Sequence, residues 1–390
     1  MSNWSRASIR SVSPTPTGKP PISTSCVLNG VLFGCLGVGG KNCPICCIIL
    51  GQNHMIRERI MKMRWIKRIM VFVGICVSMG SLLAREAAKD GGARDRKPLK
   101  VLMIGNSFTG SVMRETPAMA KKAGLRLDIV QCGIGGCPFD RHWSNVEKSG
   151  DKSFKPYGIM PSLASGGEAK FPKRANVTDM LVADKWDIVT IQQASGKSAF
   201  YDTYQPYADN LISKIRELAP QAEIVIQQTW SYSPYAVRLE KWKMTPKGMY
   251  EALKKSYAQL AAKHSLRIIP TADAVQLFRD RLPVDYGKLL TREEISNIKK
   301  PGTLDFHGDV VGSSAWKQGR KGKQKDWEKI KLRCDFSHFN ARGHYLQACV
   351  WLGFLFDVDP TTFTYCPKGL PVADAKLMRE CARDALKASK

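Results

Sequence analysis

A serine and a later Asp-x-x-His pair are the residues of this chain best suited to do chemistry. Ser107 follows a short apolar run that begins at Val101 and stops at Gly105. Asp335 and His338 stand three residues apart in a much later segment. Together, Ser, His and Asp can make a weakly nucleophilic hydroxyl reactive at neutral pH. Their types and order therefore indicate a serine hydrolase.

The spacing suggests a role for each of these residues. Asp335 can accept a hydrogen bond from one ring nitrogen of His338, while the other nitrogen takes the proton of Ser107. A hydroxyl at a helix start would also benefit from backbone N–H groups and the helix dipole. The alternatives are a serine that only caps a helix and an aspartate that caps one from a surface turn. Of the other histidines, His344 is expected to be structural. His142 and His307 lie in predicted loops and are reserve candidates for the base.

Short apolar runs alternate with longer amphipathic stretches from Pro98 onward, which indicates a parallel α/β sheet covered on both faces. Such a sheet places its ligand site beyond the carboxyl ends of the strands, where most of the candidate residues fall. The predicted strands are Val101–Ile104, Leu127–Val130, Ile188–Ile191, Ile224–Gln228 and Leu266–Ile269. The predicted helices are Met113–Ala123, Val177–Ala183, Pro206–Leu218 and Lys247–His264.

The remaining segments complete a domain expected to span residues 98–360. A last helix is predicted over Ala341–Phe356, with Asn340 as its N-cap, directly after the Asp-x-x-His turn. Two stretches rich in Gly, Pro, Lys and Ser, 143–174 and 282–333, are predicted to be irregular. Residues 361–390 are expected to form a loop and a terminal helix that packs on the outside.

The N-terminal part predicts export from a bacterial cell. A basic run after Met61, an apolar run over 69–83 and the small residue Ala84 have the order of a secretory signal over 61–84. An uncleaved anchor is the alternative, and 85–97 would be a linker. Residues 1–60 are expected to be disordered and to precede the true start, which we place at Met61 or Met63. The expected location is therefore the periplasm or the medium.

Charge and cysteine content limit the partners. Without residues 1–84 the chain has 50 basic and 33 acidic residues, a net charge of +17. Such a charge can attract anionic glycans, membranes or nucleic acid. The chain lacks a zinc-finger or RNA-binding signature, so no nucleic-acid partner is expected, and contact with a membrane is expected only through an uncleaved signal segment. The oligomeric state stays open.

The sequence predicts no cofactor and no metal. Cys43-x-x-Cys46 has no second pair at zinc spacing, and Gly105 is not followed by a phosphate-binding Gly-x-x-x-x-Gly-Lys loop. Six cysteines follow residue 84, an even number that permits disulfides in an exported protein. Cys366–Cys381 and Cys132–Cys137 are local candidates, and the pairing stays open.

Several short motifs of this chain resemble the sequence blocks of the SGNH (GDSL-type) hydrolases. The resemblance covers residues 98–356 and is nearest to a bacterial branch of unknown function that begins with a similar Gly-Asn-Ser-Phe-Thr. It implies a three-layer α/β/α sandwich with a five-stranded parallel sheet, flavodoxin-like, and a catalytic triad of Ser107, His338 and Asp335. The matching motifs are Gly105-Asn-Ser-Phe-Thr109, Gly135-Gly136, Gln192-Gln193-Ala-Ser195 and Asp335-x-x-His338.

The same resemblance implies an oxyanion hole made of three donors. These would be the Ser107 N–H, the N–H of Gly136 (with Gly135 next) and a side-chain amide after the third strand. Gln192 stands where the family usually has the Asn of Gly-x-Asn-Asp, so the geometry of the third donor is in question. One such donor contributes about 10²–10³ in rate. The glycines also suit a turn that needs positive φ.

Other side chains near the strand ends are candidates for substrate binding. Trp230 and Tyr232 follow the fourth strand, where their rings could stack on sugars. Ordinary packing under a lid is the alternative for both. Gln193 is a further candidate for a polar contact with the substrate.

These features together predict an exported serine esterase of the SGNH type. It would remove an acyl group, such as O-acetyl, from a carbohydrate, so its partner is a small-molecule or glycan ester. The alternative is a catalytically weak or inactive glycan-binding protein on the same fold, which the altered third block motivates. Peptidase or thioesterase activity on the same triad also stays open.

Overall fold

The computed structural model describes residues 24–28, 31–35, 97–166, 171–282, 289–318 and 329–390. The chain divides into two compact units, Met1–Ala88 and Lys89–Lys390. In the first unit, β1 (Thr24–Leu28) pairs antiparallel with β2 (Val31–Cys35), within the segment expected to be disordered. The predicted signal segment, the Cys43-x-x-Cys46 motif and most of the predicted linker lie outside the described residues.

The second unit is built on a seven-stranded sheet, where the sequence predicted five strands. The strands are Leu99–Gly105 (β3), Leu127–Gly133 (β4), Tyr157–Ser162 (β5), Arg174–Ala175 (β6), Ile188–Ile191 (β7), Glu223–Gln227 (β8) and Arg267–Ile269 (β9). Their order is β6-β5-β4-β3-β7-β8-β9. The five predicted strands form the parallel part of the sheet, in the order β4-β3-β7-β8-β9.

The two additional strands arise in a stretch predicted to be irregular. β5 pairs antiparallel with β4, and the short β6 pairs antiparallel with β5. Pairing with β4 satisfies backbone groups that this strand would otherwise leave open at the sheet edge. β5 contains Gly158 and Pro161, residues that are rare inside strands, and these concealed it in the sequence.

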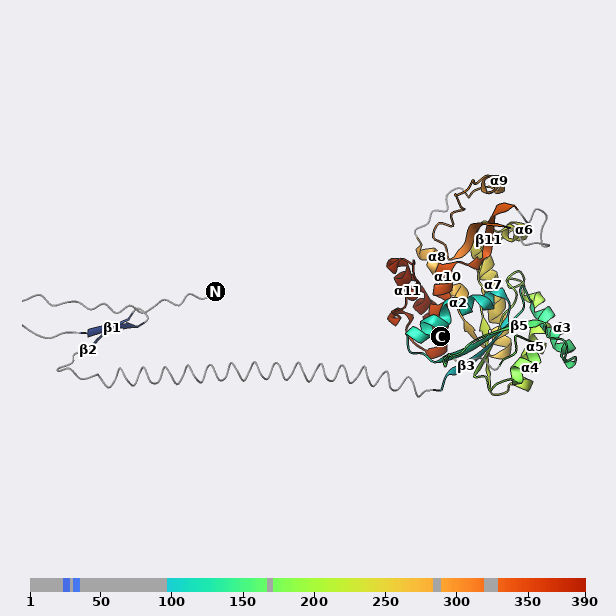
Figure 1. Cartoon of the computed structure of the whole chain (residues 1–390), viewed down its shortest axis with the longest axis horizontal. Coiled ribbons are helices and arrows are strands. Elements are labelled where there is room, and N and C mark those ends of the chain that lie inside the picture. The colour runs from blue at the N-terminus through green and yellow to red at the C-terminus, as the bar shows by residue number, and fades with distance from the viewer. Residues whose placement is uncertain (1–23, 29–30, 36–96, 167–170, 283–288, 319–328) are drawn as a thin grey trace, which may run out of the picture. The chain divides into compact units, whose positions relative to one another are not determined.

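Helices cover both faces of this sheet, so the unit has the predicted three-layer α/β/α architecture (Figure 1). One layer holds helices that pack on one another: α2 (Ser107–Lys122), α8 (Thr271–Arg281), α10 (Ala341–Phe356) and α11 (Val372–Ala388). The other holds α3 (Phe139–Glu147), α4 (Val177–Val182), α5 (Tyr207–Leu218) and α7 (Pro246–His264). Short helices connect these elements: η1 (Lys148–Gly150), η2 (Tyr201–Thr203), α6 (Val237–Trp242), α9 (Arg292–Ser296) and η3 (Pro360–Thr362).

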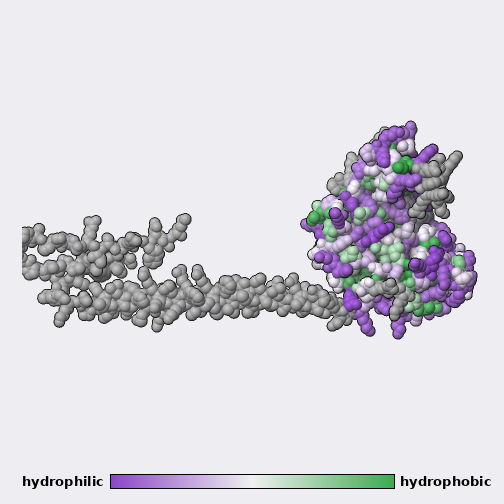
Figure 2. Space-filling view, in the orientation of Figure 1, coloured by the Kyte–Doolittle hydropathy of each residue, from purple (hydrophilic) through white to green (hydrophobic). Residues whose placement is uncertain are grey.

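The core lies on both faces of the parallel strands. Residues 101–104 of β3 are at most 1% exposed, as expected for a strand without polar alternation between two helix layers. A buried hydrogen bond joins two helices of the same layer: the Ser111 hydroxyl of α2 donates to Gln347 Oε1 of α10 over 2.6 Å. Figure 2 shows that polar side chains cover most of the visible face of this unit.

The predicted irregular stretch 282–333 contains part of a long antiparallel hairpin. β10 (Val311–Gln318) pairs with β11 (Ile330–Phe339), which carries both Asp335 and His338 and leads into α10. The Asp-x-x-His motif therefore ends a strand and is not the tight loop that we predicted. The signal was present in the sequence, since apolar residues alternate with polar ones from Ile330 to Phe336, as in a half-exposed strand.

Helix ends follow capping side chains. The N-cap prediction at Asn340 is confirmed, because its Oδ1 accepts hydrogen bonds from the N–H groups of Arg342 and Gly343. α2 begins at Ser107 rather than at Met113, because Asn106 supplies its N-cap by accepting from the Phe108 N–H. None of the described helices combines the length and the apolar character needed to cross a bilayer.

All six cysteines of the second unit are free thiols, so neither of the local disulfide candidates is formed. Cys132, Cys137, Cys349 and Cys381 are buried, and burial raises the pKa of each thiol. Such thiols pack as small apolar side chains and are poor nucleophiles.

His142, a reserve candidate for the base, is a buried structural residue. It is 1% exposed, and its Nδ1 lies 2.9 Å from the Tyr157 hydroxyl on β5. Burial, with the nearby Arg141, lowers the pKa of His142 to about 4. His344 is similar, because burial and nearby Arg114 lower its pKa to about 4.

These two histidines should make the fold sensitive to acid. Because the folded-state pKa lies below the ordinary 6.5, the unfolded chain binds the proton first as the pH falls. The stabilisation is complete above about pH 6.5 and is lost as the pH falls to about 4. Each histidine should then cost about 3 kcal/mol of unfolding free energy. Urea titrations of His142→Gln should show a slope against pH that is smaller by about one proton. A slope equal to that of the wild type would contradict this role of His142.

Candidate active site

The structure brings Ser107, His338 and Asp335 into one hydrogen-bonded row. The Ser107 Oγ lies 2.8 Å from His338 Nε2, and His338 Nδ1 lies 2.7 Å from Asp335 Oδ2. Because a carboxylate only accepts, Nδ1 carries the ring hydrogen and Nε2 is left to accept from the hydroxyl. Ser107 itself is exposed at the first position of α2, beyond the carboxyl end of β3. This arrangement can deprotonate the hydroxyl as it attacks an electrophile.

Asp335 is held as a carboxylate by hydrogen bonds from the residues that follow it on β11. Its Oδ1 accepts from the N–H groups of Ser337 and His338, while Oδ2 faces the imidazole. Partial burial acts to raise the pKa of Asp335, but these hydrogen bonds and the neighbouring imidazole outweigh it and hold the pKa well below its usual range. Asp335 therefore stays charged and fixes the orientation and tautomer of His338.

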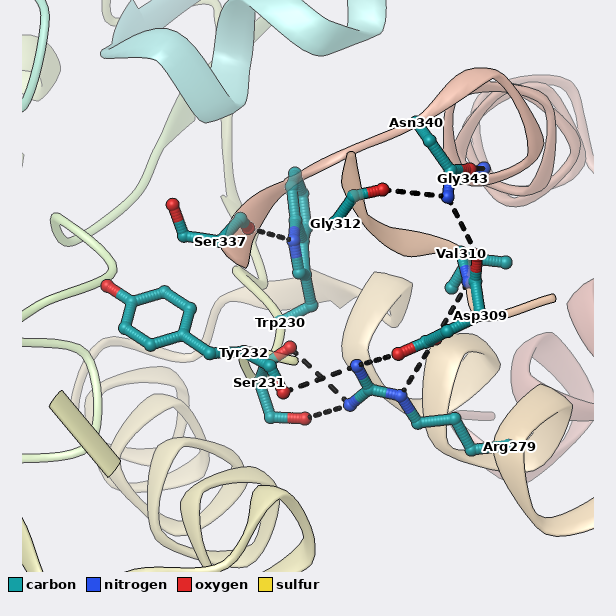
Figure 3. A network of polar contacts seen from close by, with 10 residues as sticks. All are labelled: Trp230, Ser231, Tyr232, Arg279, Asp309, Val310, Gly312, Ser337, Asn340 and Gly343. Atoms are coloured by element: carbon teal, nitrogen blue, oxygen red, sulfur yellow. Dashed lines mark hydrogen bonds and ion pairs between the residues drawn. The ribbon is translucent and has the colours of Figure 1, made fainter. Parts of the chain in front are cut away.

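A stack of three aromatic rings joins the nucleophile to the base. Trp230 lies between Phe108 and Phe339, with ring centroids 4.1 Å and 3.5 Å away and both interplanar angles at 10°. Its indole Nε1 also donates to the Ser337 carbonyl over 2.9 Å (Figure 3). Phe108 and Phe339 are the residues directly after Ser107 and His338, so the stack sets the distance between them. Trp230 is fully buried and cannot stack on a sugar, and its predicted substrate role is wrong.

A buried ion pair anchors the base of the hairpin beside this stack. Arg279 of α8 donates from Nε and Nη2 to the Asp309 carboxylate over 3.1 and 2.9 Å, with only 8% and 1% of the two side chains exposed. The guanidinium also donates to the Ser231 hydroxyl, just after Trp230. The Asp309 carbonyl accepts from the Asn340 side chain, which caps α10 (Figure 3). The pair thus ties the segment after β8 to the strand that carries His338.

Asn106 connects the first three sequence motifs by hydrogen bonds. Its Oδ1 accepts from the Phe108 N–H and from Gln192 Nε2, and its own amide donates to the Cys137 carbonyl over 3.2 Å. An aspartate could not make this last bond, so the amide at position 106 has its own function here. Gly105 allows the close approach, because a Cβ there would lie 2.0 Å from the Thr109 hydroxyl.

The structure therefore corrects the assignment of Gln192 to an oxyanion hole. Gln192 is 1% exposed and does not line the cavity at Ser107. Its Nε2 donates to Asn106 Oδ1 over 2.7 Å. Gln193 is also fully buried, and its side-chain amide is used inside the protein: it accepts from the Phe139 N–H and donates to the Thr203 carbonyl. The predicted substrate contact of Gln193 is wrong for the same reason.

Gly136 lies where a backbone donor would be useful. It lines the same cavity as Ser107 and has a φ of +64°, which favours glycine. Gly135 shares this exposed turn, which the Cys137 N–H closes by donating to the Ile134 carbonyl. The Phe108 N–H of α2 donates to the Asn106 cap, so the Ser107 N–H is the first N–H group of this helix that could act beside Gly136. Gly136 stays a predicted donor.

The cavity at Ser107 and His338 has a volume of about 830 Å³. Tyr232 lines it as predicted, although the residue is only 1% exposed and its hydroxyl is engaged with Ser195 and Arg238. Ser195 and Arg238 also line it, and the sequence did not single them out as site residues. Arg238 lies on α6, a short helix that the strand pattern does not predict. His307, the second reserve base, is not among the lining residues and lies near Asp305.

A larger groove of about 1020 Å³ runs along β9 and the C-terminal helix, away from these residues. Several of its charged side chains are already paired, as Lys254 is with Asp273 and Lys390 with Asp357. No serine–histidine pair lines it within the described residues. The smaller cavity is therefore the better candidate site. Within the described ranges no group of three His, Cys, Asp or Glu residues is arranged to hold a metal ion.

Comparison with known proteins agrees with the fold. The model of a domain of unknown function (DUF4886) matches residues 100–282, a range that includes Ser107 and ends before the hairpin with Asp335 and His338. The chain is similar to a DUF4886 family protein from Bacteroides uniformis ATCC 8492, with 24% identity and a TM-score of 0.58 over 75% of this chain and 97% of that one. A GDSL-like lipase from Bacteroides thetaiotaomicron VPI-5482 matches 70% of this chain and 97% of its own length, with 12% identity and a TM-score of 0.32. No curated protein matches the chain.

Removing the buried cation should destabilise the fold strongly. Arg279→Met leaves the Asp309 carboxylate buried without its partner, and we expect a loss of about 3–5 kcal/mol in the free energy of unfolding. Arg292→Met is the matched control, because its ion pair with Glu240 is exposed and 3.6 Å long. That variant should lose less than about 1 kcal/mol in the same urea titration. Equal losses would show that the buried pair has no special role.

Trp230 should matter more for the reactivity of Ser107 than for stability alone. Trp230→Phe loses the indole bond to Ser337, and Trp186→Phe loses a like bond to the Met180 carbonyl in a distant part of the core. Both should lose about 1 kcal/mol of unfolding free energy. Only Trp230→Phe should slow the reaction of Ser107 with a fluorophosphonate probe, by about tenfold or more, because a small displacement of the base impairs proton transfer. Equal probe rates in the two variants would rule out this positioning role.

Proposed function

We propose that this protein is an exported serine esterase of the SGNH type, which removes an acyl group, such as acetyl, from a carbohydrate. The observation that carries the proposal is the row of Ser107, His338 and Asp335, with bonds of 2.8 and 2.7 Å, at the mouth of a cavity. The row stands beyond the carboxyl ends of β3 and its neighbours, where open α/β sheets bind ligands. Export is supported by the basic and apolar runs over residues 61–84.

In the first half of the reaction, Ser107 forms a covalent acyl-enzyme. Its Oγ attacks the ester carbonyl carbon while His338 Nε2 takes the hydroxyl proton. The negative charge that develops on the carbonyl oxygen is stabilised by the Ser107 and Gly136 N–H groups and the start of α2. The imidazolium then gives its proton to the departing alcohol, and the C–O bond of the ester breaks.

In the second half, water releases the acyl group. His338 takes a proton from the water as its oxygen attacks the acyl carbon, and then returns that proton to Ser107 Oγ as the acyl bond breaks. The products are a free acid and the regenerated hydroxyl. The Asp335 carboxylate stabilises the imidazolium in both halves and is not itself protonated.

The second candidate function is a glycan-binding protein on the same fold with little or no catalysis. It is favoured by one observation, namely that the Gln192 amide is engaged with Asn106 and leaves the third donor of the oxyanion hole unassigned. The 2.8 Å contact between Ser107 Oγ and His338 Nε2 favours the esterase, because nucleophilic catalysis requires this alignment and binding alone does not.

A fluorophosphonate probe separates the two functions. The wild-type chain should be labelled, and Ser107→Ala should not be. His338→Asn should slow labelling by about a thousandfold or more, because the hydroxyl loses its base. Ser153→Ala and His307→Asn are matched controls outside the cavity and should label like the wild type.

A folded wild type that resists the probe would favour the glycan-binding function. The intact mass of the protein recovered from the periplasm tests export separately. It should lack the residues up to about position 84 if the signal is cleaved as the n-region, h-region and small-residue pattern indicates.

A further inference from the structure

One wall of the cavity carries three side chains that can donate hydrogen bonds. It consists of Ser195 after β7, Tyr232 after β8 and Arg238 on α6, and we call it the donor wall. All three side chains line the same cavity as Ser107 and His338. The reaction steps described above use none of them.

The donor wall is a directed chain of hydrogen bonds. Arg238 Nη1 donates to the Tyr232 hydroxyl over 3.1 Å, and this hydroxyl donates to Ser195 Oγ over 2.9 Å. The Ser195 oxygen therefore receives a hydrogen bond, and its own O–H remains to be donated toward the cavity. The guanidinium also lies close over Gly196, where a Cβ would stand 3.0 Å from Nη1. These contacts fix the position of a side chain that would otherwise be mobile on the surface.

Arg238 has no carboxylate partner among the described residues, and its side chain donates to the Tyr232 hydroxyl. The other cation of the lining, Lys197, is paired with Asp140 over 2.9 Å. The one carboxylate of the lining within the described ranges is Asp335, and it is engaged with His338. Arg238 thus keeps a guanidinium that no carboxylate contacts, and its planar fork of N–H groups can bind one carboxylate through two parallel hydrogen bonds.

We propose that the donor wall binds an anionic oxygen group of the substrate, above all a carboxylate, so that the esterase prefers acidic esters. The inference rests on the proposed function and adds the substrate class. A carboxylate only accepts hydrogen bonds, and it would meet the free N–H groups of Arg238 and the O–H of Ser195. A neutral hydroxyl or amide in the same place would form no ion pair with Arg238.

Two pairs of esters test the preference and locate the charge. On the acyl side, 4-nitrophenyl hemisuccinate is compared with the neutral 4-nitrophenyl succinamate. On the alcohol side, an O-acetylated methyl glucuronoside is compared with its glucuronamide. In at least one pair, the wild type should have a kcat/KM about tenfold or more in favour of the acid, the size expected for a charge-assisted hydrogen bond. Added salt should reduce this ratio.

Variants assign the preference to Arg238. Arg238→Gln should abolish the acid-to-amide ratio, and Arg238→Lys should keep part of it, because lysine retains the charge without the planar fork. Arg216→Gln removes the same charge from the exposed face of α5 and should leave the ratio unchanged. A wild type without preference in both pairs, or an Arg238→Gln variant that keeps its ratio, would overturn the inference.

Binding to Ser107→Ala separates this inference from the proposed function. If the wild type hydrolyses none of the four esters, the esterase function fails, and the donor wall can still be tested by calorimetry. Methyl glucuronoside should then bind Ser107→Ala about tenfold or more tightly than its amide, and the additional Arg238→Gln change should remove the difference. Equal affinities for acid and amide would reject the donor wall as an anion site.

Discussion

The site depends first on the packing of Trp230 between Phe108 and Phe339. Ser107 and His338 are far apart in the chain and come from opposite kinds of element, the start of a helix and the end of a strand. A hydrogen bond between two exposed side chains cannot by itself hold such elements in register. The stacked rings of Phe108 and Phe339, next to Ser107 and His338, can hold the two elements in register. A close-packed interior transmits small displacements and does not absorb them.

Polar contacts behind the stack limit where the hairpin can lie. The Arg279–Asp309 pair, the Asn340 cap and the indole bond to Ser337 all join β11 or its base to the main body of the fold. The ion pair is buried and therefore costly to break, so the base of the hairpin that carries Asp335 and His338 is held firmly. The row of Ser107, His338 and Asp335 and the donor wall line the same cavity.

Most of the parallel sheet could be predicted from the sequence, and the additions to it could not. Buried strands such as β3 are unbroken apolar runs, so period and composition identify them. β5 is half-exposed and interrupted by Gly158 and Pro161, and its pairing with β4 is a long-range contact that no local pattern encodes. The alternation along β11 was a readable signal, but its lysines and arginines also suit a solvated loop.

The sequence by itself determined the types and order of the reactive residues, because a Ser, an Asp and a His are recognisable wherever they fall. Only the tertiary structure decided which neighbours serve them. Gln192 and Trp230 proved to be buried supports, whereas Arg238 and Ser195 face the cavity. The physical reason is that a long side chain can reach either into the protein or out of it, and local sequence does not record which partner is within reach. That choice is made by packing and by the tendency of buried polar groups to find hydrogen-bond partners.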